Sequence, residues 1–151
     1  MRAVVQRVVR AEVRSRPTPD ADYETAGRID AGACVLVGVT HGDGEAEADK
    51  LAAKLAGLRI FDDADGVMNL GATDVRADFL VVSQFTLYGD TAKGRRPSWI
   101  AAARPEHAEP LVERVVQQLR AAGVRVATGR FRTEMQVDLV NDGPVTLIVE
   151  T

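Results

Sequence analysis

The sequence predicts an α/β (α+β) protein, with a mixed-sheet, barrel-like core, two main helices packed against it, and a C-terminal hairpin that carries Gly143-Pro144. Three observations lead to this prediction. Apolar segments of strand length outnumber the segments with helical spacing, and two amphipathic helical segments lie between them. The C-terminal third ends in two alternating apolar segments on either side of an Asn-Asp-Gly turn signal.

The N-terminal half contains two predicted strands and one predicted helix. Residues 3–9 (AVVQRVV) alternate in part and predict a strand, whereas the polar, proline-containing residues 14–22 predict a loop. Residues 33–39 (ACVLVGV) form a continuous apolar run, which is typical of a strand covered on both faces. Within residues 45–61, leucines recur at helical spacing after an acidic first turn, the pattern of an amphipathic helix.

The C-terminal half continues the alternation of strands and helices. Residues 79–85 (FLVVSQF) predict a second buried strand, and Pro105 opens an amphipathic helix that Gly123 is expected to end. Three further segments predict strands: residues 124–129, 135–140 and 145–150.

The composition indicates a single globular domain over residues 1–151, with 46% hydrophobic and 27% charged residues. No apolar run approaches the roughly 20 residues that a membrane helix needs. The first residues lack the apolar core of a signal peptide, and Cys34 has no partner cysteine in the chain. We therefore expect a cytoplasmic protein that does not associate with membranes.

The net charge of −3 does not favour nucleic-acid binding, so any such binding must depend on a local basic patch. The segment AKGRRPSWIAAAR offers such a patch around Trp99, and the alternative is a solvated loop. Its basic residues are Lys93, Arg95, Arg96 and Arg104.

Several familiar kinds of site are excluded by spacing. FDDADG places Phe61 and Ala72 where a calcium loop needs oxygen ligands, so an acidic turn is the better interpretation. His41 and His107 are far apart and only one cysteine exists, so no zinc set can be written and both histidines are expected at the surface. Neither histidine stands beside a recognisable nucleophile, and no phosphate-binding or dinucleotide glycine pattern occurs. An enzyme with this sequence would lack a conventional general base.

Three hydrogen-bonding side chains follow the second buried strand, namely Ser83, Gln84 and Thr86. Polar residues at a strand end often belong to a site, because the sheet fixes their position while the loop beyond leaves room for a ligand. The alternative is the ordinary polarity of a strand end.

The segments SQFTL (83–87) and NDGPVT (141–146) resemble the two signature motifs of D-aminoacyl-tRNA deacylases, the D-tyrosyl-tRNA(Tyr) deacylase family. The similarity extends along nearly the whole chain. It includes QRV (6–8), GLRIF (57–61), MNL (68–70), RPS (96–98), TGRF (128–131) and MQVDLV (135–140).

The resemblance implies a homodimeric enzyme without a cofactor or metal that hydrolyses the ester of D-aminoacyl-tRNA and acts on tRNA rather than DNA. Glycyl-tRNA is a hypothetical further substrate, because glycine has no side chain to exclude. A non-catalytic module that binds tRNA ends and a purely structural dimer are the alternatives.

The resemblance also assigns roles to individual residues. Gly143 and Pro144, joined by a cis peptide bond, would reach the active site of the partner subunit and reject L-amino acids. The catalytic segment would comprise Ser83, Gln84, Phe85 and Thr86, with the 2′-hydroxyl of the tRNA assisting cleavage. Arg7 would brace the Gly-Pro segment, and the remaining positions expected to shape the site are Met135, Asn141 and Thr146. The basic residues Lys93, Arg95, Arg96 and Arg104 would contact phosphates.

Overall fold

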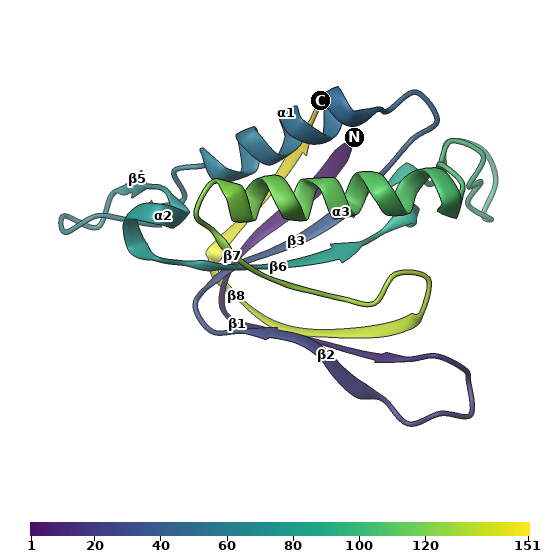
Figure 1. The fold of residues 1–151 in the computed structure, drawn as a ribbon, viewed down its shortest axis with the longest axis horizontal. Helices are drawn as coiled ribbons and strands as arrows, with labels where there is room; N and C mark the ends of the chain where they lie inside the picture. Colours follow the sequence, from purple (N-terminus) through teal and green to yellow (C-terminus); the bar gives the residue numbers. More distant parts are fainter.

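The computed structural model describes all residues 1–151 and contains eight strands, three α-helices and one 3-10 helix, η1 (Figure 1). In chain order the elements are β1 (Arg2–Arg16), β2 (Glu24–Ile29), β3 (Gly32–Gly38), α1 (Glu45–Ala56), β4 (Phe61–Asp62), β5 (Met68–Leu70), α2 (Ala72–Val75), β6 (Asp78–Ser83), η1 (Phe85–Tyr88), α3 (Pro105–Ala121), β7 (Arg125–Thr128) and β8 (Glu134–Glu150).

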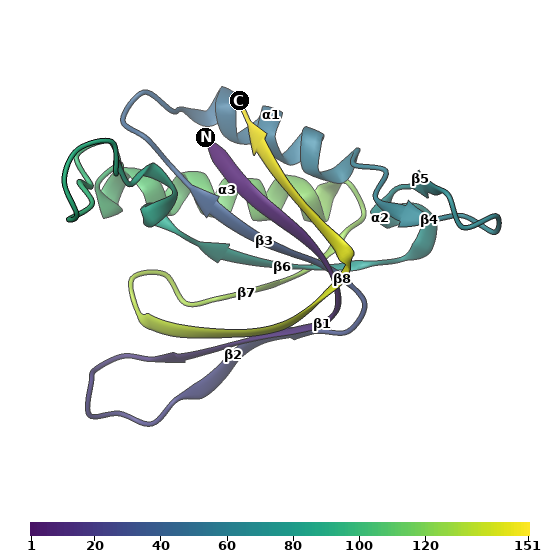
Figure 2. The same cartoon turned by 180° about the vertical axis from the view of Figure 1, so that it is seen from behind.

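One mixed sheet of six strands forms the body of the molecule. The long strand β1 pairs antiparallel with β2, β3 and β8, whereas β3, β6 and β7 run parallel to one another. Figure 2 shows β1 and β8 curving side by side along the sheet. The sheet curls until β2 approaches β7, since a Cβ added to Gly27 would lie 2.5 Å from the Thr128 carbonyl oxygen. The mixed, barrel-like core predicted from the sequence is confirmed.

Both faces of the parallel strands are covered. In β6, Phe79 and Val81 belong to the apolar cluster beneath the helices, whereas Leu80 and Val82 belong to a second cluster inside the curl of the sheet. Cys34 of β3 joins that second cluster. This alternation explains why both segments appear as continuous apolar runs, and it confirms that they are strands buried on two sides.

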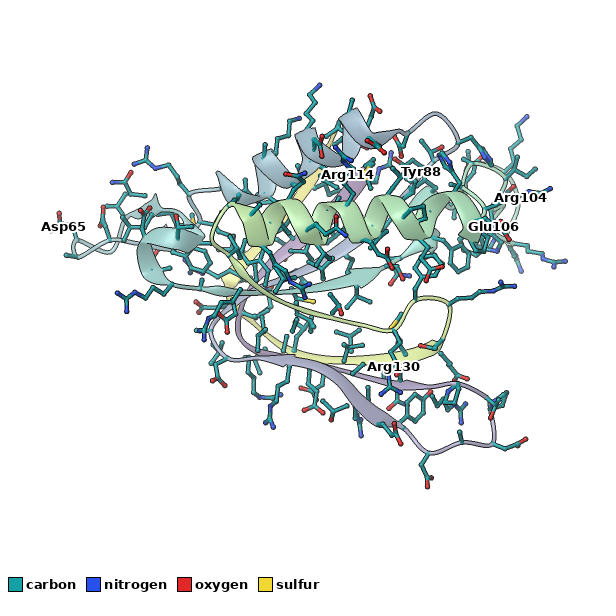
Figure 3. All side chains as sticks on the ribbon, viewed as in Figure 1. Asp65, Tyr88, Arg104, Glu106, Arg114 and Arg130 are labelled. Carbon is teal, nitrogen blue, oxygen red and sulfur yellow. The ribbon has the colours of Figure 1, made fainter.

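Helices α1 and α3 pack side by side over one face of the sheet, and they are the two main helices that the sequence predicts (Figure 1). Figure 3 shows Arg114 of α3 between them. Its guanidinium pairs with Glu45 and Asp49 of α1, each at 2.7 Å. Helix α1 ends at Ala56, well before the end of the helical segment predicted over 45–61. No helix has both the length and the apolarity to cross a membrane.

Strand β1 continues to Arg16 and pairs with a strand, β2, that the sequence did not indicate. The predicted strand over 3–9 is thus too short, and the predicted loop over 14–22 begins too early. Ala11 and Val13 point into the barrel and are buried, while the opposite face of β1 carries charges. There Arg16 binds Glu134 of β8 at 2.8 Å. The sequence pattern does not indicate a strand here, because the residues that pair with this charged face are remote in sequence.

The predicted C-terminal hairpin is wrong, because β8 is one continuous strand. Asn141 pairs with Val8 and Thr146 pairs with Gln6, so residues 142–145 form a bulge opposite Arg7 while the strand keeps its direction. The Asn141 side chain donates to the carbonyls of Arg7 (2.9 Å) and Val145 (3.0 Å) across the gap. Pro144 has no N–H, so a bulge is a suitable place for it.

The acidic segment FDDADG forms the turn between β4 and β5, as predicted. Gly66 adopts a φ of +76° and donates its N–H to the Asp63 carbonyl at 3.0 Å. The Asp63 carboxylate accepts the N–H groups of Asp65 and Val67. These bonds lower the pKa of Asp63, the bond from Val67 most. The carboxylate therefore closes the turn.

Candidate active site

A cavity of about 560 Å³ opens where the parallel strands β3 and β6 end and helix α3 begins. This is the edge at which open parallel sheets commonly bind ligands, because the chain leaves the strands there in loops. Its lining comprises Val37, Val39, Val82, Ser83, Gln84, Phe85, Pro105, Ala108, Val112, Phe131, Arg132, Thr133, Met135 and Val137. Four predicted site residues therefore meet at one cavity: Ser83, Gln84, Phe85 and Met135.

The segment that follows β6 is held closely against β3. The Gln84 N–H donates to the Val37 carbonyl at 2.7 Å, which extends the ladder past the end of β6. Gly38 of β3 allows η1 to approach, since a Cβ there would lie 3.1 Å from the Gln84 carbonyl oxygen. Arg2 binds the Leu87 carbonyl at 2.7 Å from the other side. The backbone at the cavity wall is thus fixed by sheet contacts.

The N–H groups of Phe85 and Thr86 open the helix η1. The first N–H groups of a helix have no acceptor within it and remain available to an oxygen of a ligand. Thr86 itself does not line the cavity, and its hydroxyl accepts a hydrogen bond from the Gln84 amide. Gln84 and Phe85 therefore line this wall, and Thr86 follows directly behind them.

The cavity contains no histidine, carboxylate, lysine or cysteine, and Arg132 is its one ionisable group. His41 and His107 are exposed, as predicted, and they bind the backbone carbonyls of Ile100 (2.7 Å) and Asp43 (2.8 Å). No group of three or more His, Cys, Asp or Glu residues is arranged to hold a metal ion. The polar side chains that line the cavity are thus two hydroxyls, one amide and one guanidinium, from Ser83, Thr133, Gln84 and Arg132.

The second motif lies in the bulge of β8, where Gly143 and Pro144 are exposed and joined by a cis peptide bond. Gly143 has a φ of +110°, a conformation that side chains rarely adopt. Thr146 donates to Asn141, which in turn holds the two ends of the bulge together. The exposed main chain of this segment is thus supported from beneath.

Arg7 lies under the bulge and is 8% exposed. Its guanidinium pairs with Asp142 of the bulge and with Asp62 of β4, both at 3.1 Å, and donates to the Ile60 carbonyl at 2.9 Å. A Cβ on Gly143 would lie 3.1 Å from its terminal nitrogen. Arg7 therefore links the bulge to the β4–β5 hairpin.

The bulge and the cavity of one chain are well separated. Arg7 of β1 lies opposite the bulge and pairs with Ala33 of β3, which in turn pairs with Phe79 of β6. Ser83 lies four residues farther along β6. That offset is about 13 Å along β6, and the three strand spacings from β8 to β6 add about 14 Å across the sheet. Gly143 and Pro144 do not line the cavity of their own chain.

The basic residues occupy a loop beyond η1. Backbone hydrogen bonds of 2.8 and 2.9 Å between Asp90 and Ser98 close the loop, and its tip carries Lys93, Arg95 and Arg96, all exposed. Figure 3 shows Arg104 where α3 begins, at the opposite end of the molecule from Asp65. The four cations are therefore outside the cavity.

Sequence reasoning did not select Phe131, Arg132 and Thr133, which line the cavity from the segment after β7. Arg132 has a φ of 58°, unusual for a residue other than glycine, so its backbone is held by its surroundings. Gly129 leaves room for Met135, because a Cβ there would lie 2.7 Å from the methionine sulfur. The only sequence signal for this segment is TGRF (128–131), one of the segments that carry the family resemblance.

Comparison with known sequences identifies close relatives over the full length. The family model described as D-Tyr-tRNA(Tyr) deacylase matches residues 4–150. A D-aminoacyl-tRNA deacylase of Symbiobacterium thermophilum is 53% identical over 151 residues, covering 100% of this chain and 96% of that protein. One of Brevibacillus brevis is also 53% identical and covers 100% of both chains.

Solved structures share the fold over nearly the whole chain. The structure named c-Myc DNA Unwinding Element Binding Protein superposes with a TM-score of 0.89 at 36% identity, covering 100% of this chain and 99% of that one. A probable eukaryotic D-amino acid tRNA deacylase has a TM-score of 0.80 at 17% identity, covering 99% and 98%, and this likeness supports the fold alone. From the family match and the 53% identical relatives, the chain belongs to the D-Tyr-tRNA(Tyr) deacylase family.

Proposed function

We propose that this protein is a hydrolase that cleaves the ester of D-aminoacyl-tRNA and releases free D-amino acid and tRNA. The full-length relatives named D-aminoacyl-tRNA deacylase support the activity. The observation that supports the proposal most is the cavity at the ends of β3 and β6, which is lined by Phe85, the first residue of η1. Residues 1–151 would act as one deacylase domain in the cytoplasm.

The chemistry would depend on position and backbone electrostatics. A water oxygen forms a bond with the ester carbonyl carbon, the carbonyl oxygen becomes an oxyanion, and the N–H groups of Phe85 and Thr86 stabilise it. Loss of one such donor typically costs about 10²–10³-fold in rate. The bond to the ribose oxygen then breaks, and that oxygen takes up a proton. Since the cavity offers no general base, the neighbouring 2′-hydroxyl of the tRNA would assist the proton transfer.

Selection for the D configuration would come from Gly143 and Pro144 of a partner subunit. Carbonyl oxygens of this segment would accept hydrogen bonds from the α-ammonium group, and the missing Cβ of Gly143 would allow close approach. With ammonium and ester fixed, an L side chain would meet main-chain atoms, whereas a D side chain would point away. Glycyl-tRNA would then be accepted, because it has no side chain to exclude.

Three features support a homodimer. Strand β8 pairs with β1 alone, so 17 residues of strand present a free edge. Apolar side chains along it are exposed in the single chain, with Ile148 at 70% and Val140 at 41%. The separation between bulge and cavity also favours a site completed by a second copy.

The acceptor end of the tRNA would be gripped by the basic loop beyond η1. Lys93, Arg95, Arg96 and Arg104 would pair with phosphates, which makes the affinity dependent on salt. Each phosphate contact to a single strand contributes about 0.7 to the slope of log affinity against log salt concentration. An affinity for tRNA that does not change with salt would argue against this grip.

The proposal is tested by incubating the purified protein with D-tyrosyl-tRNA, L-tyrosyl-tRNA and glycyl-tRNA and following ester loss. We expect turnover of the D-aminoacyl and glycyl esters and little turnover of the L ester. Equal rates for the two enantiomers would refute the selection mechanism. Binding without turnover would indicate a module that recognises tRNA ends.

Thr86→Ala separates the assisted mechanism from nucleophilic catalysis by Thr86. We expect the variant to keep much of its activity, because the hydroxyl is engaged with Gln84 and no base lies beside it. A variant that binds substrate normally but has no activity would indicate that Thr86 is the nucleophile.

A further inference from the structure

An exposed aromatic pair stands at the rim of the cavity. The rings of Phe85 and Trp99 meet edge to face, with centroids 5.4 Å apart and planes at 72°. Phe85 is 57% exposed, Trp99 43% and the adjacent Ile100 85%. Phe85 also lines the cavity, so the pair extends from the inside of the site to the outer surface. Large apolar groups exposed together at the entrance of a site are typical of a binding surface.

Trp99 anchors the basic loop to the cavity wall. Its indole packs directly on Gly89, the residue after η1, where a Cβ would lie 2.5 Å from Cζ3. The paired backbone bonds between Asp90 and Ser98 close the loop immediately before Trp99. His41 and Thr40 hold the residues after it through the carbonyls of Ile100 (2.7 Å) and Ala101 (2.6 Å). The aromatic pair therefore has a fixed position between the cavity and the cations of the loop.

Charge and aromatic character together indicate the occupant. Residues 89–104 carry four cations and one carboxylate, Asp90, although the whole chain has a net charge of −3. Proteins that bind single-stranded nucleic acid combine exposed aromatic rings with a basic surface, because bases stack on the rings while phosphates pair with the cations. We propose that the unpaired nucleotides that precede the esterified adenosine stack on Phe85 and Trp99 and contact Ile100, with phosphates held by Lys93, Arg95 and Arg96. The inference rests on the proposed function, since it assigns the part of tRNA that lies just outside the cavity.

Trp99 is the only tryptophan, so its fluorescence reports stacking without any need for turnover. We expect uncharged tRNA to quench this emission, and tRNA trimmed of its unpaired 3′ end to quench it much less. Lys50→Gln, an exposed change on α1, serves as the matched control and should respond like the wild type. Binding of intact tRNA without a change in Trp99 emission would overturn the proposal.

Activity on two substrates gives an independent test. Trp99→Ala should lower kcat/KM for D-tyrosyl-tRNA at least about tenfold more than kcat/KM for the D-tyrosyl ester of adenosine, which lacks the preceding nucleotides. Trp99→Phe keeps a ring and should recover most of the loss. Replacing Lys93, Arg95 and Arg96 together by glutamine should lower the salt slope of tRNA affinity by about 2.

The outcomes that would overturn the stacking role differ from the outcome that would overturn the proposed function. An equal loss on both substrates, or no loss on either, would overturn the stacking role. A change in oligomeric state in Trp99→Ala would instead assign the aromatic pair to an interface between copies, and it would overturn the proposal as well. A wild-type protein that quenches with tRNA but hydrolyses neither substrate would refute the proposed function and leave the stacking surface supported.

Discussion

Two variants with complementary defects can test whether Gly143 and Pro144 act in the neighbouring subunit. Ala108→Trp places a large ring in the cavity from α3, where Ala108 is half-buried and the space is about 560 Å³. Gly143→Val distorts the bulge, because the φ of +110° suits glycine and an added Cβ would lie 2.8 Å from a Val145 methyl. Each homodimer should be inactive in ester hydrolysis. Along the sheet, the bulge lies about 13 Å in the strand direction and about 14 Å across from Ser83, so we expect it to act on the other subunit.

The activity of mixed dimers tests this arrangement quantitatively. Co-expression with two different affinity tags allows the heterodimer of Ala108→Trp and Gly143→Val to be isolated. If the segment acts across the two-fold axis, the open cavity of one subunit meets the intact bulge of the other. One of the two sites is then restored, and about half of the wild-type activity on D-tyrosyl-tRNA should return.

The opposite arrangement supplies the control. A subunit carrying both substitutions, paired with a wild-type subunit, should be inactive if the segment acts across the interface and about half active if it acts within its own chain. A heterodimer of the two single variants that stays inactive, together with activity in this control, would refute the reasoning.

Three further predictions concern stability and reactivity. Arg7→Met removes a buried cation that pairs with two half-exposed carboxylates, and it should lower the free energy of unfolding by about 2–3 kcal/mol in urea titrations. The loss is smaller than for a fully buried ion pair, because the two carboxylates regain contact with water. The hydrogen bond from Arg16 lowers the pKa of Glu134 below 4.5, so its contribution to stability is present above that pH and lost as pH falls through the folded value. Glu134→Gln should therefore flatten the dependence of stability on pH in acid, and an unchanged dependence would count against the pair. Burial raises the pKa of Cys34 to about 11, so a thiol reagent at pH 8 should modify it only after unfolding, and rapid labelling of the folded protein would contradict this.

The elements that sequence reasoning located are those whose burial pattern is local. The continuous apolar runs at 33–39 and 79–85 predicted β3 and β6, and leucine spacing predicted α1. Strand β2 and the distal half of β1 were missed, because their outer faces carry charges. A charged side chain such as Arg16 indicates a loop until its partner is known, and Glu134 is 118 residues away.

Some residues of the candidate site also have a local sequence signal, and others do not. Ser83 and Gln84 were identifiable because polar side chains interrupt an apolar strand at its end, and the cavity contains both. Phe131 and Arg132 had no such signal. They reach the cavity because β7 pairs in parallel with β6, which brings the segment after each strand to the same edge of the sheet. That pairing cannot be derived from the residues of either strand alone.

The error at the C-terminus has a physical cause that bears on function. Asn-Asp-Gly is a turn signal in an isolated segment, yet β1 offers 15 residues of partner strand and pairs on both sides of the interruption. Continuing the ladder satisfies more backbone groups than reversing it, and the Asn141 side chain bridges the remaining gap. A hairpin would place Gly143 at the tip of a turn that projects beyond the paired strands. A bulge holds it between two paired halves of the same strand, with Arg7 beneath, so its main chain is presented at a fixed position on the sheet. The proposed exclusion of L side chains requires such a fixed position, because a flexible tip would move aside for an L side chain.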